Sequence, residues 1–135
     1  MGFVIDARSA ARLVGVHPDL VKVVQDCAKN GTMPFTFGVT EGVRSLAQQK
    51  ADVAAGKSQT MKSRHLDGHA VDLVVLQSGQ PVWAWPPYSV LADQMKAAAE
   101  RCGVKINWGG DWESLRDGPH FQLDWEAYPS DAPVA

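Results

Sequence analysis

Cysteine is scarce in this sequence, and neither sign of charge dominates it. Both features exclude some classes of protein. Cys27 and Cys102 are the only cysteines among 135 residues, and they do not form a C-x-x-C pair. A reduced, cytosolic folding environment with two idle thiols is therefore the simpler interpretation, and a structural disulfide is the less favoured one. The net charge of -2 argues against a general nucleic-acid-binding protein, which usually has a strong basic excess.

Long apolar runs are also missing. No stretch approaches the roughly 18 apolar residues that a membrane-spanning helix needs, so we expect no membrane insertion. Residues 1–16 have no apolar segment of the kind found in secretory signals, so we expect no export either. With 45% hydrophobic and 21% charged residues, the composition is that of an ordinary globular protein. We expect residues 1–135 to form one domain, with a frayed tail from about Tyr128.

Hydrophobic periodicity and capping residues predict helices interleaved with short strands. Ser9 is expected to cap the first helix, and Lys57 to Arg64 to form an exposed loop. Helices are predicted over 9–14, from about 18 to 30, over 45–55 and over 89–102, and strands over 35–40, 70–76, 104–107 and 120–123. This order predicts an α+β domain in which helices pack on a small, mainly antiparallel sheet.

Two separated segments contain the residues with catalytic chemistry. In the first, His65 precedes Asp72 by seven residues, and Gly68 between them allows the chain to turn so that the two side chains converge. Asp72 interrupts a strand of valine and leucine, where a carboxylate is normally paired or bound to metal. An ion pair with an arginine is the alternative. The second segment contains Asp117 and, three residues later, His120.

Two imidazoles and one carboxylate can form an open zinc site, in which water takes the fourth position. Asp117 could then accept a proton from that water. Gln122 shares a strand face with His120 and could orient that ring. His69 falls on the strand face opposite Asp72, so it is interpreted as structural, and His17 as a solvated residue before a helix.

These segments resemble the D,D-peptidase and L-alanyl-D-glutamate endopeptidase superfamily, whose pattern is S-x-H-x-x-G-x-A-x-D followed by D/E-x-x-H. Glu41 to Ser45 resembles the arginine segment of that family, and Trp108 to Trp112 resembles the tryptophan-rich loop of its phage-lysin members. The resemblance spans roughly residues 35 to 123. The pattern is matched at Ser63, His65, Gly68, Ala70, Asp72, Asp117 and His120.

The resemblance implies a Hedgehog/D,D-peptidase-like fold and a single zinc ion. Asp117 becomes the general base, and Arg44 the cation that polarises the scissile carbonyl. Ser63 either contacts substrate or only fixes its loop, and the sequence does not separate these roles. The implied zinc ligands are His65, Asp72 and His120.

The function that the resemblance implies is that of an endolysin. Such a zinc-dependent hydrolase cleaves the L-Ala–D-Glu bond of the peptidoglycan stem peptide for host cell lysis. It would act as a monomer and stay in the host cytoplasm until a holin opens the way to the periplasm and cell wall. A D,D-carboxypeptidase or D-Ala-D-Ala dipeptidase with the same zinc chemistry is one alternative, and a non-catalytic zinc-stabilised binding domain is another. Asp117 and Arg44 argue against the last, because a purely structural zinc site needs neither.

Overall fold

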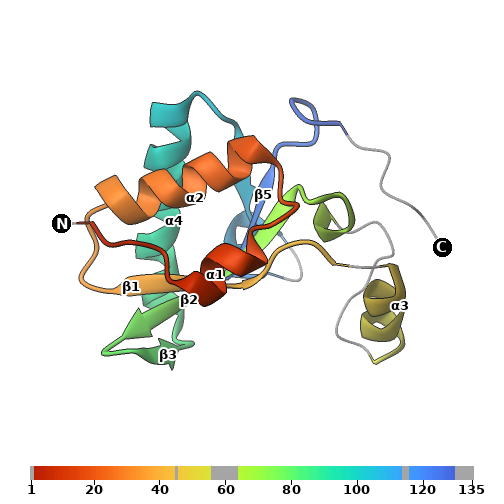
Figure 1. Ribbon diagram of the computed structural model, residues 1–135, viewed down its shortest axis with the longest axis horizontal. Helices are drawn as coiled ribbons and strands as arrows, with labels where there is room; N and C mark the ends of the chain where they lie inside the picture. Colours follow the sequence, from red (N-terminus) through yellow and green to blue (C-terminus); the bar gives the residue numbers. More distant parts are fainter. Residues whose placement is uncertain (1, 45, 56–63, 114–115, 130–135) are drawn as a thin grey trace.

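The computed structural model describes residues 2–44, 46–55, 64–113 and 116–129. Helices are interleaved with short strands along it, and the strands form an antiparallel sheet, so the predicted α+β class is confirmed (Figure 1). The elements are α1 (Ala7–Arg12), α2 (Pro18–Asn30), β1 (Thr36–Glu41), α3 (Leu46–Ala54), η1 (Arg64–Asp67), β2 (Ala70–Gln77), β3 (Gln80–Val82), α4 (Trp85–Cys102), β4 (Ile106–Trp108), η2 (Gly109–Asp111) and β5 (His120–Leu123).

The strand β2 is central to the sheet. The strand order is β1-β2-β5-β4, with β3 paired to the far end of β2, and every pairing is antiparallel. The register of β2 against β5 places Asp72 directly opposite His120. Two of the predicted site residues are therefore neighbours in one hydrogen-bonded ladder.

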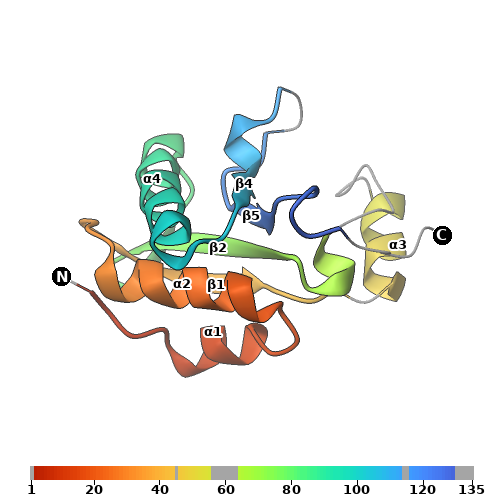
Figure 2. The same ribbon diagram turned by 90° about the horizontal axis from the view of Figure 1, so that it is seen from above.

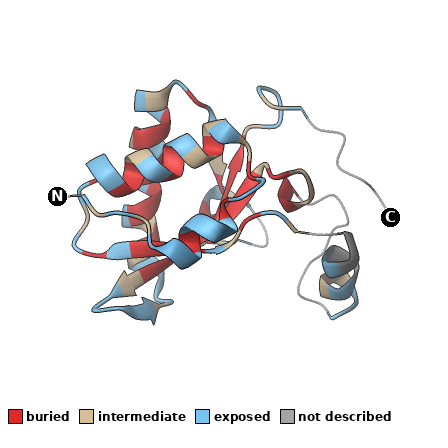
Figure 3. Ribbon diagram, in the orientation of Figure 1, coloured by how far each residue is buried: buried red, intermediate tan, exposed pale blue. Residues whose placement is uncertain are grey.

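One face of the sheet closes the hydrophobic core. Side chains alternate between the two faces of a strand, so Val71, Leu73 and Val75 share one face and Asp72 lies on the other. The first three are fully buried with residues of α2 and α4, which contact each other (Figure 2). Burial along β2 is nearly continuous (Figure 3). The core thus gives rigid support from behind to the face that presents Asp72.

The starts of two helices differ from the prediction. The first begins at Ala7, because the Asp6 carboxylate accepts a hydrogen bond from the amide of Ser9 at 2.7 Å. Ser9 was wrongly expected to be the cap, and its hydroxyl instead accepts from the amide of Val39 at 2.9 Å. The last helix begins at Trp85 rather than Ser89, since prolines in a first turn lose no helical hydrogen bond.

Residues expected at the surface are packed instead. Arg64 is 2% exposed, so the prediction of an exposed loop is wrong at that residue, and the loop's residues 57–63 lie outside the described residues. His17 caps α2 by accepting from the amide of Asp19 at 3.0 Å, and its ring packs against Tyr128. Tyr128, the residue at which the frayed tail was expected to begin, donates to the Asp19 carboxylate at 2.6 Å.

The two cysteines are free thiols, as expected. Burial raises the pKa of the Cys27 thiol to about 12, so that this group stays protonated and unreactive at neutral pH. Among the described helices, none combines the length and the apolar character that crossing a membrane requires.

Candidate metal centre and active site

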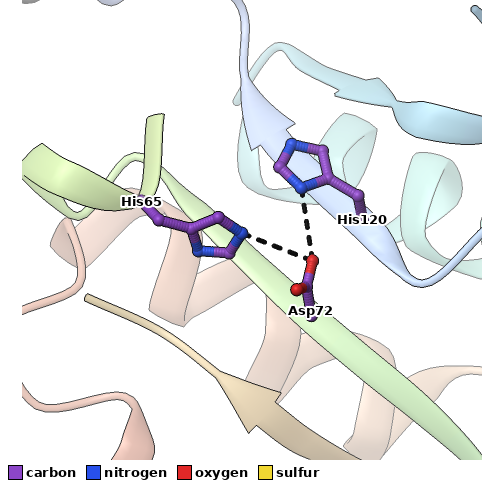
Figure 4. Close-up of side chains that lie close together, drawn as sticks. All are labelled: His65, Asp72 and His120. Atoms are coloured by element: carbon purple, nitrogen blue, oxygen red, sulfur yellow. Dashed lines mark hydrogen bonds and ion pairs between the residues drawn. The ribbon is translucent and has the colours of Figure 1, made fainter. Parts of the chain in front are cut away.

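The structure brings together the three side chains that the sequence predicts as ligands (Figure 4). His65 comes from η1, Asp72 from β2 and His120 from β5. Their candidate ligand atoms all lie within 4.8 Å of one another. The Asp72 Oδ1 atom is 3.4 Å from His65 Nε2 and 3.2 Å from His120 Nδ1. Both imidazoles therefore face the same carboxylate oxygen, and the structure shows no arginine pairing with Asp72 among the described residues.

The outer nitrogen of each ring is held by a carbonyl oxygen. His65 Nδ1 lies 2.8 Å from the backbone oxygen of Gly42, and His120 Nε2 lies 2.7 Å from the side-chain oxygen of Gln122. A carbonyl oxygen can only accept, so each ring donates its outer N–H. In the neutral imidazoles, the inner nitrogens then present lone pairs toward Asp72.

This arrangement fits a bound cation. Lone pairs of two imidazoles and a carboxylate repel one another unless a proton or a metal ion lies between them. Burial alone would raise the pKa of Asp72, but hydrogen bonds and charge from His120 and His65 hold it well below its usual value. Burial opposes protonation of His120, yet its contacts with Asp72 raise its pKa. A set of two nitrogens and one oxygen suits Zn²⁺, so the residues present fit the expected metal.

Asp117 lies beside His120 at the edge of this cluster. Its backbone carbonyl accepts from the amide of His120 at 3.2 Å, and its own amide donates to Gly109 at 3.1 Å. A Cβ atom placed on Gly109 would be 3.1 Å from the Cβ atoms of both Asp117 and His120. Burial, together with the charge of Asp72, raises the pKa of Asp117, and the nearby positive groups only partly offset this. A carboxylate with a raised pKa is a better proton acceptor near neutral pH.

Arg44 contacts the segment that contains His65. Its amide donates to the His65 carbonyl at 2.8 Å. Its guanidinium binds both oxygens of Glu41, at 2.6 and 2.7 Å, and lies 3.6 Å from Asp52. Burial disfavours the charge, but Glu41 and the other carboxylates raise the pKa of Arg44 overall, so this side chain remains a cation. Ser63 lies outside the described residues.

Comparison with known families gives this site a context. The model of the phage L-alanyl-D-glutamate peptidase family matches residues 1–126. The chain belongs to this family. The sequence resemblance is thereby confirmed, and the match includes both candidate ligand segments.

Two curated proteins that are similar to this chain come from phages. The L-alanyl-D-glutamate peptidase of Listeria phage A118 is 35% identical over 94 residues, which are 69% of this chain and 32% of that protein. The chain thus spans about a third of that relative. The L-alanyl-D-glutamate peptidase of Escherichia phage T5 is 27% identical over 121 residues, which are 87% of each chain.

Solved structures show the same fold. The Serratia marcescens L-Ala D-Glu endopeptidase ChiX superposes with a TM-score of 0.87 at 46% identity, covering 96% of this chain and 95% of that one. The vancomycin-resistance D,D-dipeptidase VanXYg gives a TM-score of 0.52 at 18% identity, covering 80% of this chain and 50% of that one. The likeness to VanXYg concerns the fold alone. It confirms the expected D,D-peptidase-like fold of this chain.

Sequence reasoning missed the Gly42 carbonyl, and the structure shows the contacts of other residues around the site. The Gly42 carbonyl orients His65, but a backbone oxygen leaves no sequence signal. The ring of Trp112 packs against His120 at 5.1 Å between centroids. Trp108, at the start of the tryptophan-rich segment, is 7% exposed and donates its indole N–H to the Gly118 carbonyl at 2.7 Å. Gln122 was predicted from strand alternation alone, and the structure places it against His120.

We expect Gln122→Leu to weaken zinc affinity by about 10–100-fold, because partners that orient a ligand typically contribute this much. Leucine cannot accept the His120 N–H, so the ring loses its fixed tautomer. Gln122→Glu should retain the affinity, since a carboxylate also accepts. Gln77→Leu changes an exposed glutamine at the end of β2 and should have no effect. Chelator competition measures all three, and equal affinities for Gln122→Leu and Gln77→Leu would contradict the expectation.

Proposed function

We propose that this chain is a zinc-dependent endopeptidase that hydrolyses the L-Ala–D-Glu bond of the peptidoglycan stem peptide. The observation that carries the proposal is the convergence of His65, Asp72 and His120 beside Asp117, in a chain of the phage L-alanyl-D-glutamate peptidase family. The name of the Serratia relative, an L-Ala D-Glu endopeptidase, supports the same bond.

Each residue has a role that follows from its place. When bound at the three ligands, Zn²⁺ supplies a Lewis acid that lowers the pKa of water toward about 7. Asp117 takes the proton of the attacking water and delivers it to the amine nitrogen of the departing D-Glu residue. Arg44 remains cationic and stabilises the negative charge that develops on the scissile carbonyl oxygen. Ser63 is proposed to contact the substrate.

The setting of this activity is part of the proposal. The substrate is bacterial peptidoglycan, and the enzyme acts on it as a monomer. Relatives from two phages support a role in host lysis. The chain would then accumulate in the host cytoplasm and reach the cell wall after a holin opens the inner membrane.

Mass spectrometry of fragments released from purified peptidoglycan tests the proposal. The digests contain added zinc, EDTA, or the Asp117→Ala variant. New peptides that begin with D-Glu, and that require both zinc and Asp117, are the expected result. Release of free D-Ala would instead make the chain a D,D-carboxypeptidase with the same site. A protein that binds zinc but releases no fragment would be a binding domain.

A further inference from the structure

Arg64 is a buried arginine immediately before His65, and the chemistry proposed above gives it no role. Its side chain is 2% exposed although the residue opens a short helical turn. Its Nη2 atom lies 3.0 Å from the carbonyl oxygen of Leu123, 3.4 Å from that of Asp124 and 2.7 Å from that of Tyr128. One guanidinium group therefore forms hydrogen bonds with the end of β5 and with the turn that follows it.

The turn over residues 124–128 is itself anchored. The amide of Tyr128 donates to the carbonyl of Asp124 at 2.9 Å, and its hydroxyl donates to Asp19 of α2 at 2.6 Å. Trp125 covers the guanidinium of Arg64, whose central carbon lies 3.9 Å from the ring centroid. We call Arg64 together with residues 123–128 the C-terminal clasp. It links η1, β5 and α2.

The clasp matters because His65 is the candidate ligand that lies off the sheet. Asp72 and His120 are held opposite each other by the pairing of β2 with β5. The position of His65 relative to them depends on what binds η1 to the sheet. On one side these contacts come from Gly42 and Arg44. On the other side Arg64 fastens η1 to the end of the strand that carries His120.

Burying Arg64 in the clasp is also less favourable for folding than burying an apolar side chain there. The Nε and Nη1 atoms of Arg64 are buried and have no hydrogen-bond partner among the described residues. Buried donors without partners disfavour folding, and an apolar side chain would fill this space without that cost. In some proteins, buried charged groups of this kind fix one specific arrangement of the segments around them.

We infer that Arg64 is a positioning residue for the metal centre: through the C-terminal clasp it fixes His65 against Asp72 and His120. This inference rests on the proposed metal site. It assigns Arg64 an effect on metal affinity that exceeds its effect on folding. It also extends the machinery of the site to Tyr128, beyond the residues 1–126 that the family model matches.

The test measures the Kd for Zn²⁺ by chelator competition in the full chain, together with the melting temperature of each metal-free protein. Arg64→Met removes all three carbonyl contacts and should weaken zinc binding by about 10–100-fold. Arg64→Lys retains a donor and should recover most of the affinity. Arg12→Met is the matched control, since Arg12 also binds a backbone carbonyl, that of Val39 at 2.8 Å, but in α1. It should leave the Kd unchanged.

The possible outcomes separate a failure of this inference from a failure of the proposed function. If Arg64→Met lowers the melting temperature but binds zinc like the wild type, the clasp is merely structural and the inference fails. If Arg64→Met does not fold, Trp125→Ala decides, because it uncovers the guanidinium at a residue already 44% exposed. A raised Kd in that variant supports the clasp, and an unchanged Kd overturns it. A wild-type protein that binds no zinc would instead contradict the proposed metal site itself.

Discussion

Replacing His120 with alanine is expected to abolish stoichiometric zinc binding and hydrolysis together. The remaining ligands would be one imidazole and one carboxylate, whereas catalytic zinc is normally held by three protein ligands. Loss of the metal also removes its contribution to stability, which is about 4 kcal/mol when free zinc is a thousandfold above the Kd. The melting temperature in zinc should fall by roughly 10–20 °C for a domain of this size. Metal analysis and thermal melting measure both effects.

His69→Ala is the matched control for His120→Ala. His69 is also a partly buried histidine close to the ligand segments, but its ring contacts His17 and Tyr128 rather than the cluster. It should lose some stability and still bind one zinc per chain. EDTA should lower the melting temperature of the wild type and of His69→Ala, but not that of His120→Ala. A His120→Ala protein with full zinc content would contradict the ligand assignment.

The candidate site residues could be predicted because each of them has a local signal, and the family resemblance grouped them into one site. Asp72 interrupts an apolar strand, and a buried carboxylate needs a partner wherever the strand lies in the fold. His120 and Gln122 are two residues apart on a strand, so their shared face follows from the period alone. The strand over 35–40 was found by alternation, and the strand over 70–76 by its almost continuous apolar residues. The end of α4 was found by Gly103, whose positive φ of 69° closes that helix.

The remaining features depend on contacts between distant segments. The burial of Arg64 follows from three carbonyl groups at least 59 residues away, and nothing near position 64 indicates them. His17 and Tyr128 pack together for the same reason, although both looked exposed in the sequence. Predictions from propensity use only a residue's neighbours in the chain. The burial of these side chains depends instead on tertiary packing. The supporting shell of the site is therefore seen only in the folded structure.

Asp117→Ala is expected to reduce the hydrolysis rate by about a thousandfold, the middle of the range for loss of a general acid–base group. The protein should still bind one zinc and unfold at nearly the wild-type temperature, because the structure shows no hydrogen bond to the Asp117 carboxylate among the described residues. Removing a half-buried carboxylate whose pKa is raised, largely by burial, should not destabilise the fold. Peptide hydrolysis, zinc content and thermal melting measured on one preparation separate these effects.

Two further variants test whether Asp117 acts by proton transfer: Asp117→Asn, and Asp111→Ala as a control. Asparagine keeps the size of the side chain but cannot take up a proton, so its loss of rate should match that of alanine. Asp111 ends η2, in the same connection between β4 and β5 as Asp117, where it is exposed and pairs with Lys96 at 2.7 Å. Its replacement should leave hydrolysis nearly unchanged, because a surface ion pair contributes little. If Asp117→Asn retained most of the activity, proton transfer by Asp117 would be excluded, and its role would be to position the substrate or the water.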